Sequence, residues 1–141
     1  MEYDPGHEIG AATENRFQNL MSIRDDTTPS WLLGTIPAGD VWDSRGVDFF
    51  VHLAHRDGGL PVKVPVQIKS SRAGADHFRA TQSIDRLRNI ILFILKRRDK
   101  DAYLRRMIYY NLGLIRDSGV RFDEYYARER ERGEAHWKSR Q

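Results

Sequence analysis

The clearest pattern along the chain is an alternation of apolar and polar residues that marks two neighbouring strands. Over residues 46–54 every odd position is valine, phenylalanine or leucine, which is the period of a strand with one buried face. Residues 62–70 alternate in the same way, and the turn-rich segment 55–61 separates the two. The pattern predicts a β-hairpin. Pro65 lacks an N–H, so the second strand must leave that position unpaired on one side.

Helical periodicity precedes the hairpin. Over residues 8–21 the core-facing residues fall within one half of a helix surface at about 100° per residue; they are Ile9, Ala12, Thr13, Phe17, Leu20 and Met21. A short apolar stretch at residues 31–33 and a loop over residues 36–45 follow. The first part of the chain is therefore expected to be a helix, a loop region and a hairpin.

Further helices and one more strand are expected after the hairpin. Residues 75–87 are weakly helical, and residues 90–95 form an apolar run that suits a strand covered on both faces, with a helix as the alternative. A helix over residues 101–116 is expected to end near Gly119, and an exposed, charge-alternating helix is expected from Asp123. These elements predict an α/β fold, with a mixed sheet flanked by helices and a helical C-terminal part from about residue 101.

Length and composition limit the number of domains, the location of the protein and the kinds of site that it can contain. With 141 residues and 16.4 kDa, we expect one domain spanning residues 1–141. The sequence contains neither an apolar run of roughly 18 residues nor a secretory leader, so we expect a soluble, cytoplasmic protein without membrane contacts. The absence of cysteine excludes disulfides, thiol nucleophiles and zinc–thiolate sites. Any metal would be held by oxygen or imidazole, which favours Mg²⁺ or Mn²⁺.

The net charge of +3 is distributed unevenly. Residues 1–71 contain 6 basic and 10 acidic residues, whereas residues 72–106 contain 10 basic and 4 acidic residues. Most of the basic residues are arginine, which suits bidentate phosphate contacts. For each arginine taken alone, a solvated surface residue is the favoured interpretation.

Candidate chemistry lies on the hairpin. Period-two geometry puts Gln67 and Lys69 side by side on one strand face, although an ordinary exposed face explains them equally well. In an antiparallel pair, opposed residue numbers add to a constant. A turn centred on residues 57–58 puts Asp48 opposite Gln67, and one centred on residues 58–59 puts Asp48 opposite Lys69. A longer loop would allow an even sum, which would put Asp48 on the other face.

These residues form an oxygen-rich group that suits a divalent cation. Asp48 supplies a carboxylate, Gln67 an amide oxygen, and Ile68 a backbone carbonyl. Glu14 lies about 140° from Ile9 on the helical wheel, at the rim of the face that packs toward the sheet, and can reach the hairpin edge. Taken alone, Glu14 is also consistent with a boundary residue facing water.

The arrangement resembles the core of the PD-(D/E)XK nuclease superfamily. Glu14 on a helix, Gly46-Val47-Asp48 opening a strand, and Val66-Gln67-Ile68-Lys69-Ser70-Ser71 closing the hairpin are similar to restriction-endonuclease-like proteins with a GID…QVKS type of core. The resemblance covers about the first half of the chain. It implies a restriction-endonuclease-like mixed sheet flanked by helices.

The resemblance also implies residue roles. Asp48, Gln67, Ile68 and Glu14 would be metal ligands of Mg²⁺ or Mn²⁺, and Lys69 would be the catalytic lysine, so that Glu14, Asp48, Gln67 and Lys69 form the catalytic set. The chain departs from the family pattern in two ways, because no proline directly precedes Asp48 and glutamine stands in the usual acidic position. The glutamine removes a negative charge, which weakens cation affinity or indicates an inactive DNA-binding relative.

Residues after the hairpin are candidates for phosphate contacts. Serine hydroxyls and arginines directly follow the predicted site; they are Ser70, Ser71, Arg72, Arg79, Arg86 and Arg88. Asp40 and Asp43 could supply a further ligand, but turn formation is the favoured interpretation of both. His52 and His77 are weaker candidates, since a lone histidine is usually not a ligand.

The sequence thus predicts a metal-dependent DNA endonuclease of defence or mobile-element type that hydrolyses phosphodiester bonds. One alternative is a catalytically inactive nucleic-acid-binding or accessory protein on the same fold. A second is a protein-interaction module that uses the tyrosine-rich later helices. For double-strand cleavage we expect a homodimer formed through the C-terminal helices.

Overall fold

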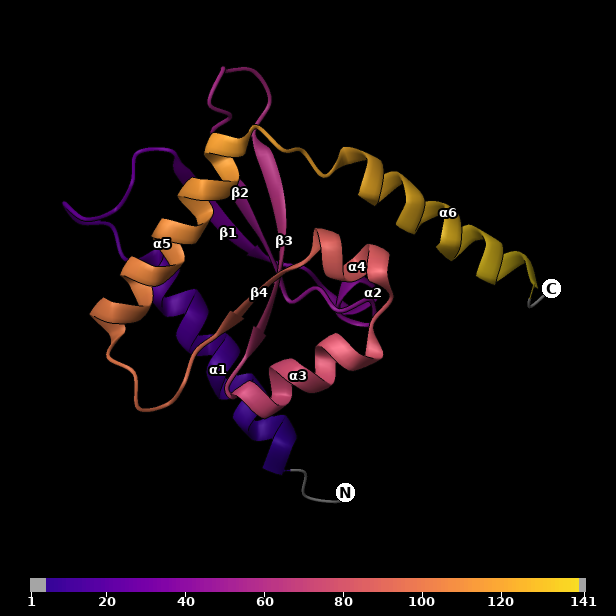
Figure 1. Cartoon of the computed structure of the whole chain (residues 1–141), viewed down its shortest axis with the longest axis horizontal. Helices are drawn as coiled ribbons and strands as arrows, with labels where there is room; N and C mark the ends of the chain where they lie inside the picture. The colour runs from indigo at the N-terminus through magenta and orange to yellow at the C-terminus, as the bar shows by residue number, and fades with distance from the viewer. Residues whose placement is uncertain (1–4, 140–141) are drawn as a thin grey trace.

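Four strands form one mixed sheet in the order β1-β2-β3-β4. The computed structural model describes residues 5–139, and their side chains from residue 9 to residue 133. The strands are β1 (Leu32–Pro37), β2 (Phe49–Leu53), β3 (Val62–Lys69) and β4 (Ile91–Ile94). The helices are α1 (Pro5–Ser22), α2 (Asp40–Asp43), α3 (Arg72–Thr81), α4 (Ile84–Asn89), α5 (Asp101–Ser118) and α6 (Asp123–Ser139). The α/β class, the flanking helices and the helical C-terminal part are therefore as predicted (Figure 1).

The predicted hairpin is present as β2 and β3. The two strands pair antiparallel with Phe49 opposite Val66 and Leu53 opposite Val62. β3 also pairs with β4 in parallel, but that ladder begins only at Val66. Pro65 lies just before it, where a missing N–H leaves no bond to β4 unmade.

A strand before the hairpin is missing from the sequence-based prediction. β1 pairs antiparallel with β2 and includes Ile36 and Pro37, which the sequence pattern assigns to a loop. Its side chains are mostly exposed or half-buried, and Gly34 interrupts the alternation. Pairing with β2 therefore decides the conformation of this segment, not its own hydrophobic pattern.

The apolar segment after the hairpin forms the strand β4, as predicted, and not the alternative helix. It lies at the edge of the sheet, and only Phe93 among its four residues is buried. The prediction that both faces of this strand are covered holds only in part, because Ile91, Leu92 and Ile94 are half-buried rather than buried. The segment between β3 and β4 forms two helices, α3 and α4, where one weak helix had been predicted. Ser71 and Ser83 cap their N-termini.

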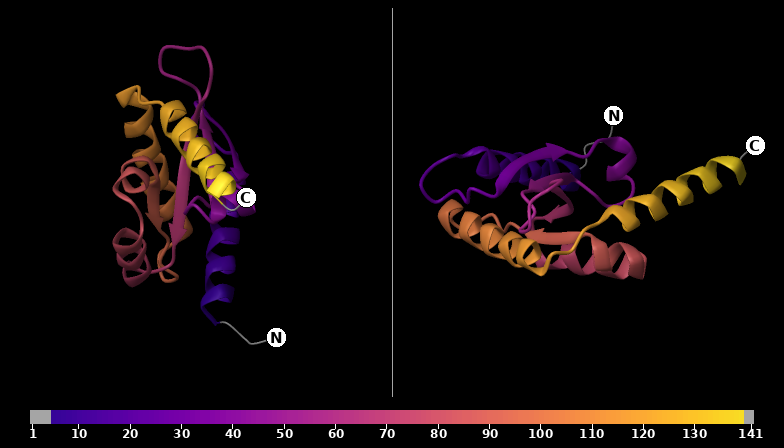
Figure 2. Two further views of the ribbon diagram at one scale, coloured as in Figure 1. Left: turned by 90° about the vertical axis from the view of Figure 1, so that its right-hand side faces the viewer. Right: turned by 90° about the horizontal axis from the view of Figure 1, so that it is seen from above.

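The two faces of the sheet pack against different helices. On one face Phe17 of α1 lies 5.0 Å from Phe49 and 6.2 Å from Phe93, measured between ring centres. On the other face Phe50 of β2 lies 5.4 Å from Trp42 and 5.7 Å from Tyr126, again between ring centres. The sheet is therefore covered on both sides (Figure 2).

The first half of α6 is packed, which corrects the prediction of an exposed helix. The buried residues are Phe122, which directly precedes the helix, and Tyr125, Tyr126 and Glu129 within it. Their spacing is that of one helix face. The hydroxyl group of Tyr126 donates to the carbonyl oxygen of Lys63 at 2.6 Å. Beyond this anchored part the helix extends away from the rest of the molecule (Figure 1).

The remaining helices agree with the pattern only in part, because Ile9 and Ala12 of α1, which are predicted to face the core, are exposed. α5 ends at Gly119, which is left-handed with φ 72°. In α1, Phe17, Leu20 and Met21 are buried, whereas Ile9 is exposed because the start of the helix runs past the end of the sheet. Within residues 5–139, no helix combines the length and the apolar character required to cross a lipid bilayer.

Candidate metal centre

The predicted site residues line one cavity of about 550 Å³ at the end of β3. α1, the connection from α2 to β2, the end of β3 and α3 each contribute to its wall. Glu14, Asp48, Gln67, Ile68, Lys69 and Ser70 are all among the lining residues. The structure thus brings together residues that are far apart in the sequence.

The strand register explains how Asp48 reaches the cavity. The β2–β3 ladder ends at the pair Phe49–Val66, and Asp48 follows one step beyond it. This register puts Asp48 across from Gln67. It is one of the two odd registers that the sequence allowed. The backbone N–H of Asp48 donates to Val66 at 2.8 Å, and that of Ile68 donates to Asp48 Oδ2 at 2.8 Å. These bonds fix the carboxylate of Asp48 in place.

Three carboxylates meet in the cavity. One oxygen each from Glu14, Asp43 and Asp48 lies within 4.8 Å of the others. The sequence pattern favours a turn-forming role for Asp43 over metal binding, and the structure corrects this interpretation by placing its carboxylate in the group. The only signal for it was its position shortly before Asp48 in an acidic loop. Asp40, interpreted in the same way, is outside the group.

A tight turn brings Asp43 back to Asp48. The N–H of Gly46 donates to the carbonyl oxygen of Asp43 at 3.0 Å, and that of Val47 donates to Trp42 at 2.9 Å. Gly46 has φ 85°, a backbone conformation that residues with a Cβ rarely adopt. A Cβ at this position would lie 2.9 Å from the ring of Phe78, which is buried. Glycine is therefore required both by the backbone angle and by the space available.

Substitution of Gly46 tests this turn. We expect Gly46→Ala to lower the free energy of unfolding by roughly 2–4 kcal/mol, from the left-handed backbone and the contact with Phe78 together. Gly58→Ala is the matched control, because Gly58 has φ 83° and a Cβ built there meets no other residue within 4 Å; we expect a loss of about 1–2 kcal/mol there. Urea unfolding measures both, and equal losses would show that the contact with Phe78 does not matter.

The electrostatics of the group favour a bound cation. The pKa of Asp48 is raised to about 8, mainly by burial and also by the neighbouring Glu14 and Asp43, against the lowering effect of the hydrogen bond from Ile68. Three carboxylates at this distance repel one another when all are ionised. A divalent cation relieves the repulsion, and a purely oxygen donor set suits Mg²⁺ or Mn²⁺. The residues present therefore fit the metal that the sequence predicted.

Cation binding should depend on pH with a defined sign. Because a cation must displace the proton from Asp48, whose pKa is about 8, we expect the apparent Mg²⁺ affinity to rise about tenfold per pH unit from pH 6 to pH 8 and then level off. Calorimetric titration at pH 6, 7, 8 and 9 measures this. An affinity that stays constant over the whole range would contradict the involvement of Asp48.

Gln67 and Ile68 lie against each other. The Gln67 side chain is 6% exposed, and its Nε2 donates to the carbonyl oxygen of Ile68 at 3.4 Å, a long hydrogen bond. The amide and the carbonyl that had been predicted as ligands thus interact with each other and both line the cavity. Neither adds negative charge, so the three acids carry the charge of the site.

Lys69 completes the polar wall of the cavity. It is the last residue of β3, and its Nζ lies 5.8 Å from the centre of the Phe78 ring in α3. His52 and His77 are outside the wall of this cavity. Burial and the nearby Lys63 lower the pKa of His52.

The predicted phosphate-binding residues divide into three groups. Ser70 lines the cavity, whereas Ser71 caps α3 by accepting from the N–H of Gly74 at 3.0 Å. The arginines of the second group are exposed; they are Arg72, Arg79 and Arg88. Arg86 instead donates to the buried Glu129 at 3.1 Å. Its guanidinium is engaged by Glu129 within the protein, so it is not available for a contact to DNA.

Comparison with known proteins identifies no relative of this chain. No protein family, curated protein or solved structure matched the chain. The chemistry of the cavity is therefore the basis for assigning a function.

Proposed function

We propose that the protein is a metal-dependent DNA endonuclease that hydrolyses phosphodiester bonds, on a fold resembling that of the PD-(D/E)XK nucleases. One observation carries the proposal: Glu14, Asp43 and Asp48 bring carboxylate oxygens within 4.8 Å of one another, in a cavity that Lys69 also lines. Acidic oxygens for a divalent cation beside a lysine ammonium are the groups that phosphodiester hydrolysis requires.

Each residue has a distinct role in this proposal. Glu14, Asp43 and Asp48 hold the cation, which when bound polarises a phosphate oxygen and lowers the pKa of a water molecule. Lys69 orients the attacking water or stabilises negative charge that develops on the phosphate. Gln67 and the Ile68 carbonyl contribute neutral oxygens at the wall of the cavity.

Asp43 offsets the departure at Gln67. In the family that the chain resembles, an acidic residue usually occupies the position of Gln67, and the substitution removes one negative charge. The carboxylate of Asp43 lies near those of Glu14 and Asp48, so the site keeps three acidic groups. The proposal of an active enzyme therefore does not require a charge at position 67.

Polar residues at the cavity wall and on the two helices that follow β3 suit a nucleic-acid backbone. Ser70 lies at the cavity wall, and Arg72, Arg79 and Arg88 are exposed on the helices that follow β3. Arginine is well suited to bidentate phosphate contacts. A homodimer through α5 and α6 would allow both strands of a duplex to be cut, and a role in defence or in a mobile element would fit such an activity.

A second candidate is a nuclease-fold protein that binds DNA without cutting it. The observation in its favour is the neutral, nearly buried Gln67 in the usual position of an acid. Both candidates predict that DNA affinity falls steeply as salt is added, because phosphate contacts release counterions. Only the first predicts cleavage.

Incubation of the purified chain with supercoiled plasmid and with single-stranded DNA separates the two. We expect nicking in Mg²⁺ or Mn²⁺ and none in EDTA. Salt-sensitive binding without cleavage in either metal would favour the second candidate. A chain that neither binds nor cleaves DNA would contradict both candidates.

A further inference from the structure

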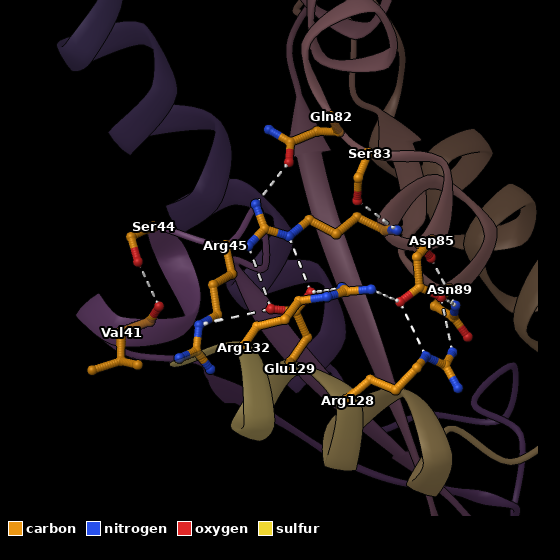
Figure 3. Close-up of polar contacts among 11 residues, drawn as sticks. Val41, Ser44, Arg45, Gln82, Ser83, Asp85, Asn89, Arg128, Glu129 and Arg132 are labelled. Atoms are coloured by element: carbon orange, nitrogen blue, oxygen red, sulfur yellow. Dashed lines mark hydrogen bonds and ion pairs between the residues drawn. The ribbon is translucent and has the colours of Figure 1, made fainter. Parts of the chain in front are cut away.

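A fully buried carboxylate lies outside the cavity, in α6. Glu129 is 0% exposed. Its Oε1 accepts from Arg86 Nε at 3.1 Å and from Arg132 Nη1 at 2.8 Å, and its Oε2 accepts from Arg86 Nη2 at 3.3 Å. Burial of a charge is costly unless it is paired in this way. Figure 3 shows the network in which Glu129 is the central acid.

A third guanidinium joins Glu129 to the candidate metal centre. Arg45 Nε lies 3.8 Å from Glu129 Oε2, and the Arg45 side chain is only 20% exposed. Arg45 belongs to the turn between Asp43 and Asp48, and its backbone N–H donates to Trp42 at 2.9 Å. Its guanidinium also lies 5.2 Å from the centre of the Trp42 ring. α6 therefore contacts the turn that positions two of the three clustered acids.

Gly133 supports the same contact from the α6 backbone. It follows Glu129 by one helical turn, so both face the same side. A Cβ built on Gly133 would overlap Nη2 at the far end of the flexible Arg45 side chain, so the guanidinium would have to move. Glycine inside a helix costs about 1 kcal/mol of stability relative to alanine, and here its benefit is the space it leaves for the guanidinium of Arg45.

α6 has a second anchor that does not involve Arg45. Asp85 of α4 accepts from Arg128 Nη2 at 2.9 Å and from Arg132 Nη2 at 2.7 Å. Removing this anchor would loosen α6 without touching the turn that contains Asp43. The two anchors therefore allow the stability of α6 to be separated from the position of Arg45.

We propose that Glu129 is a positioning residue of the metal centre, which acts through Arg45 to hold the Asp43–Asp48 turn in the geometry that binds the cation. This inference rests on the proposed metal site. The C-terminal helix is then part of the machinery for cation binding, although none of its described side chains lines the cavity. A purely structural ion-pair network would instead affect cation binding only through overall stability.

Mn²⁺ binding to the full chain tests the inference, with three variants measured at a temperature at which circular dichroism finds each one folded. We expect Glu129→Gln to weaken Mn²⁺ binding about tenfold, the lower end of the loss typical when a residue that orients metal ligands is changed. Asp85→Asn is the matched control and should bind within about twofold of the unchanged chain. Gly133→Ala should weaken binding several-fold, although alanine favours the helix, because it displaces Arg45.

Each outcome is informative. Weaker binding in Glu129→Gln and Gly133→Ala, but not in Asp85→Asn, supports the inference. If Glu129→Gln does not fold, the Mn²⁺ affinity of Gly133→Ala alone decides whether the inference holds. Unchanged affinity in these two variants, or losses in all three that follow thermal stability, overturns the inference and leaves the metal site standing. Absence of Mn²⁺ binding by the unchanged chain overturns both the proposed function and the inference.

Discussion

Replacement of Asp48 by asparagine is expected to lower the rate of metal-dependent DNA cleavage by about 1000-fold or more. Asparagine keeps the shape of the side chain and can still accept the hydrogen bond from Ile68, which is 2.8 Å long in the structure. It removes the negative charge at the most constrained of the three clustered acids, and a hard cation needs anionic oxygen ligands. Initial rates of plasmid nicking at saturating Mg²⁺ measure the effect.

Asp40→Asn is the matched control for that experiment. Asp40 is an exposed acid on the same short helix as Asp43 and lies outside the carboxylate group. We expect Asp40→Asn to cleave within about twofold of the unchanged chain. Equal losses in the two variants, or cleavage that survives Asp48→Asn, would contradict the assignment of the site.

Unfolding cannot account for the expected loss of activity. The pKa of Asp48 is about 8 in the folded chain and ordinarily 3.8. Between these values the folded chain keeps a proton that the unfolded chain releases, so stability decreases as the pH rises through this window. Asparagine removes that penalty. Without metal, Asp48→Asn should therefore be more stable than the unchanged chain at pH 9, by a few kcal/mol, and about equally stable below pH 4.

Replacement of Lys69 by methionine is expected to slow cleavage by about 100- to 1000-fold while leaving cation affinity within about twofold. Methionine preserves much of the side-chain length but cannot stabilise charge in the transition state, and loss of one such donor typically costs this much. Lys69 contributes no ligand oxygen to the carboxylate group. Single-turnover cleavage rates and Mg²⁺ calorimetry on the same preparation measure the two quantities separately.

Lys63→Met is the matched control for Lys69. Lys63 lies on the same strand, and its Nζ lies 4.6 Å from the ring centre of Phe50 and 4.5 Å from that of Tyr126. Its loss should reduce stability while the cleavage rate of the folded protein stays unchanged. A large loss of cation affinity in Lys69→Met, or a rate near that of the unchanged chain, would contradict the role given to Lys69.

The central part of the site could be predicted because strand geometry is local. The alternation over residues 46–54 and 62–70 defines two strands, and a hairpin connection limits how they pair. Asp48, Gln67 and Lys69 thus become neighbours once an odd register is chosen. The sequence left open which register is adopted, because turn-forming residues fill the whole connecting segment. The structure has Phe49 opposite Val66.

The contribution of Asp43 could not be predicted from local pattern. It depends on the left-handed Gly46 and on the hydrogen bond from Val47 to Trp42, which together reverse the chain just before β2. An aspartate in a polar loop carries the same sequence signal whether it forms a turn or binds a cation. Its role becomes visible only when Glu14 and Asp48 are brought close in space.

The packing of α6 was missed for a different reason. Its buried face includes Tyr125 and Tyr126 and continues from the preceding Phe122, but its last member is Glu129, a charged residue that a hydrophobic pattern counts as exposed. Burial of that carboxylate depends on Arg45, Arg86 and Arg132, which come from three separate segments. Tertiary charge pairing of this kind leaves no periodic signal in the sequence.

Diffraction from a crystal of the protein soaked in Mn²⁺, with anomalous differences collected near the manganese absorption edge, tests the central claim most directly. We expect a single dominant anomalous peak within coordination distance of carboxylate oxygens from Glu14, Asp43 and Asp48, absent from an Asp48→Asn crystal treated in the same way. A crystal without a peak in this cavity, or with its strongest peak on other residues, would contradict the claim that these three acids form a metal centre.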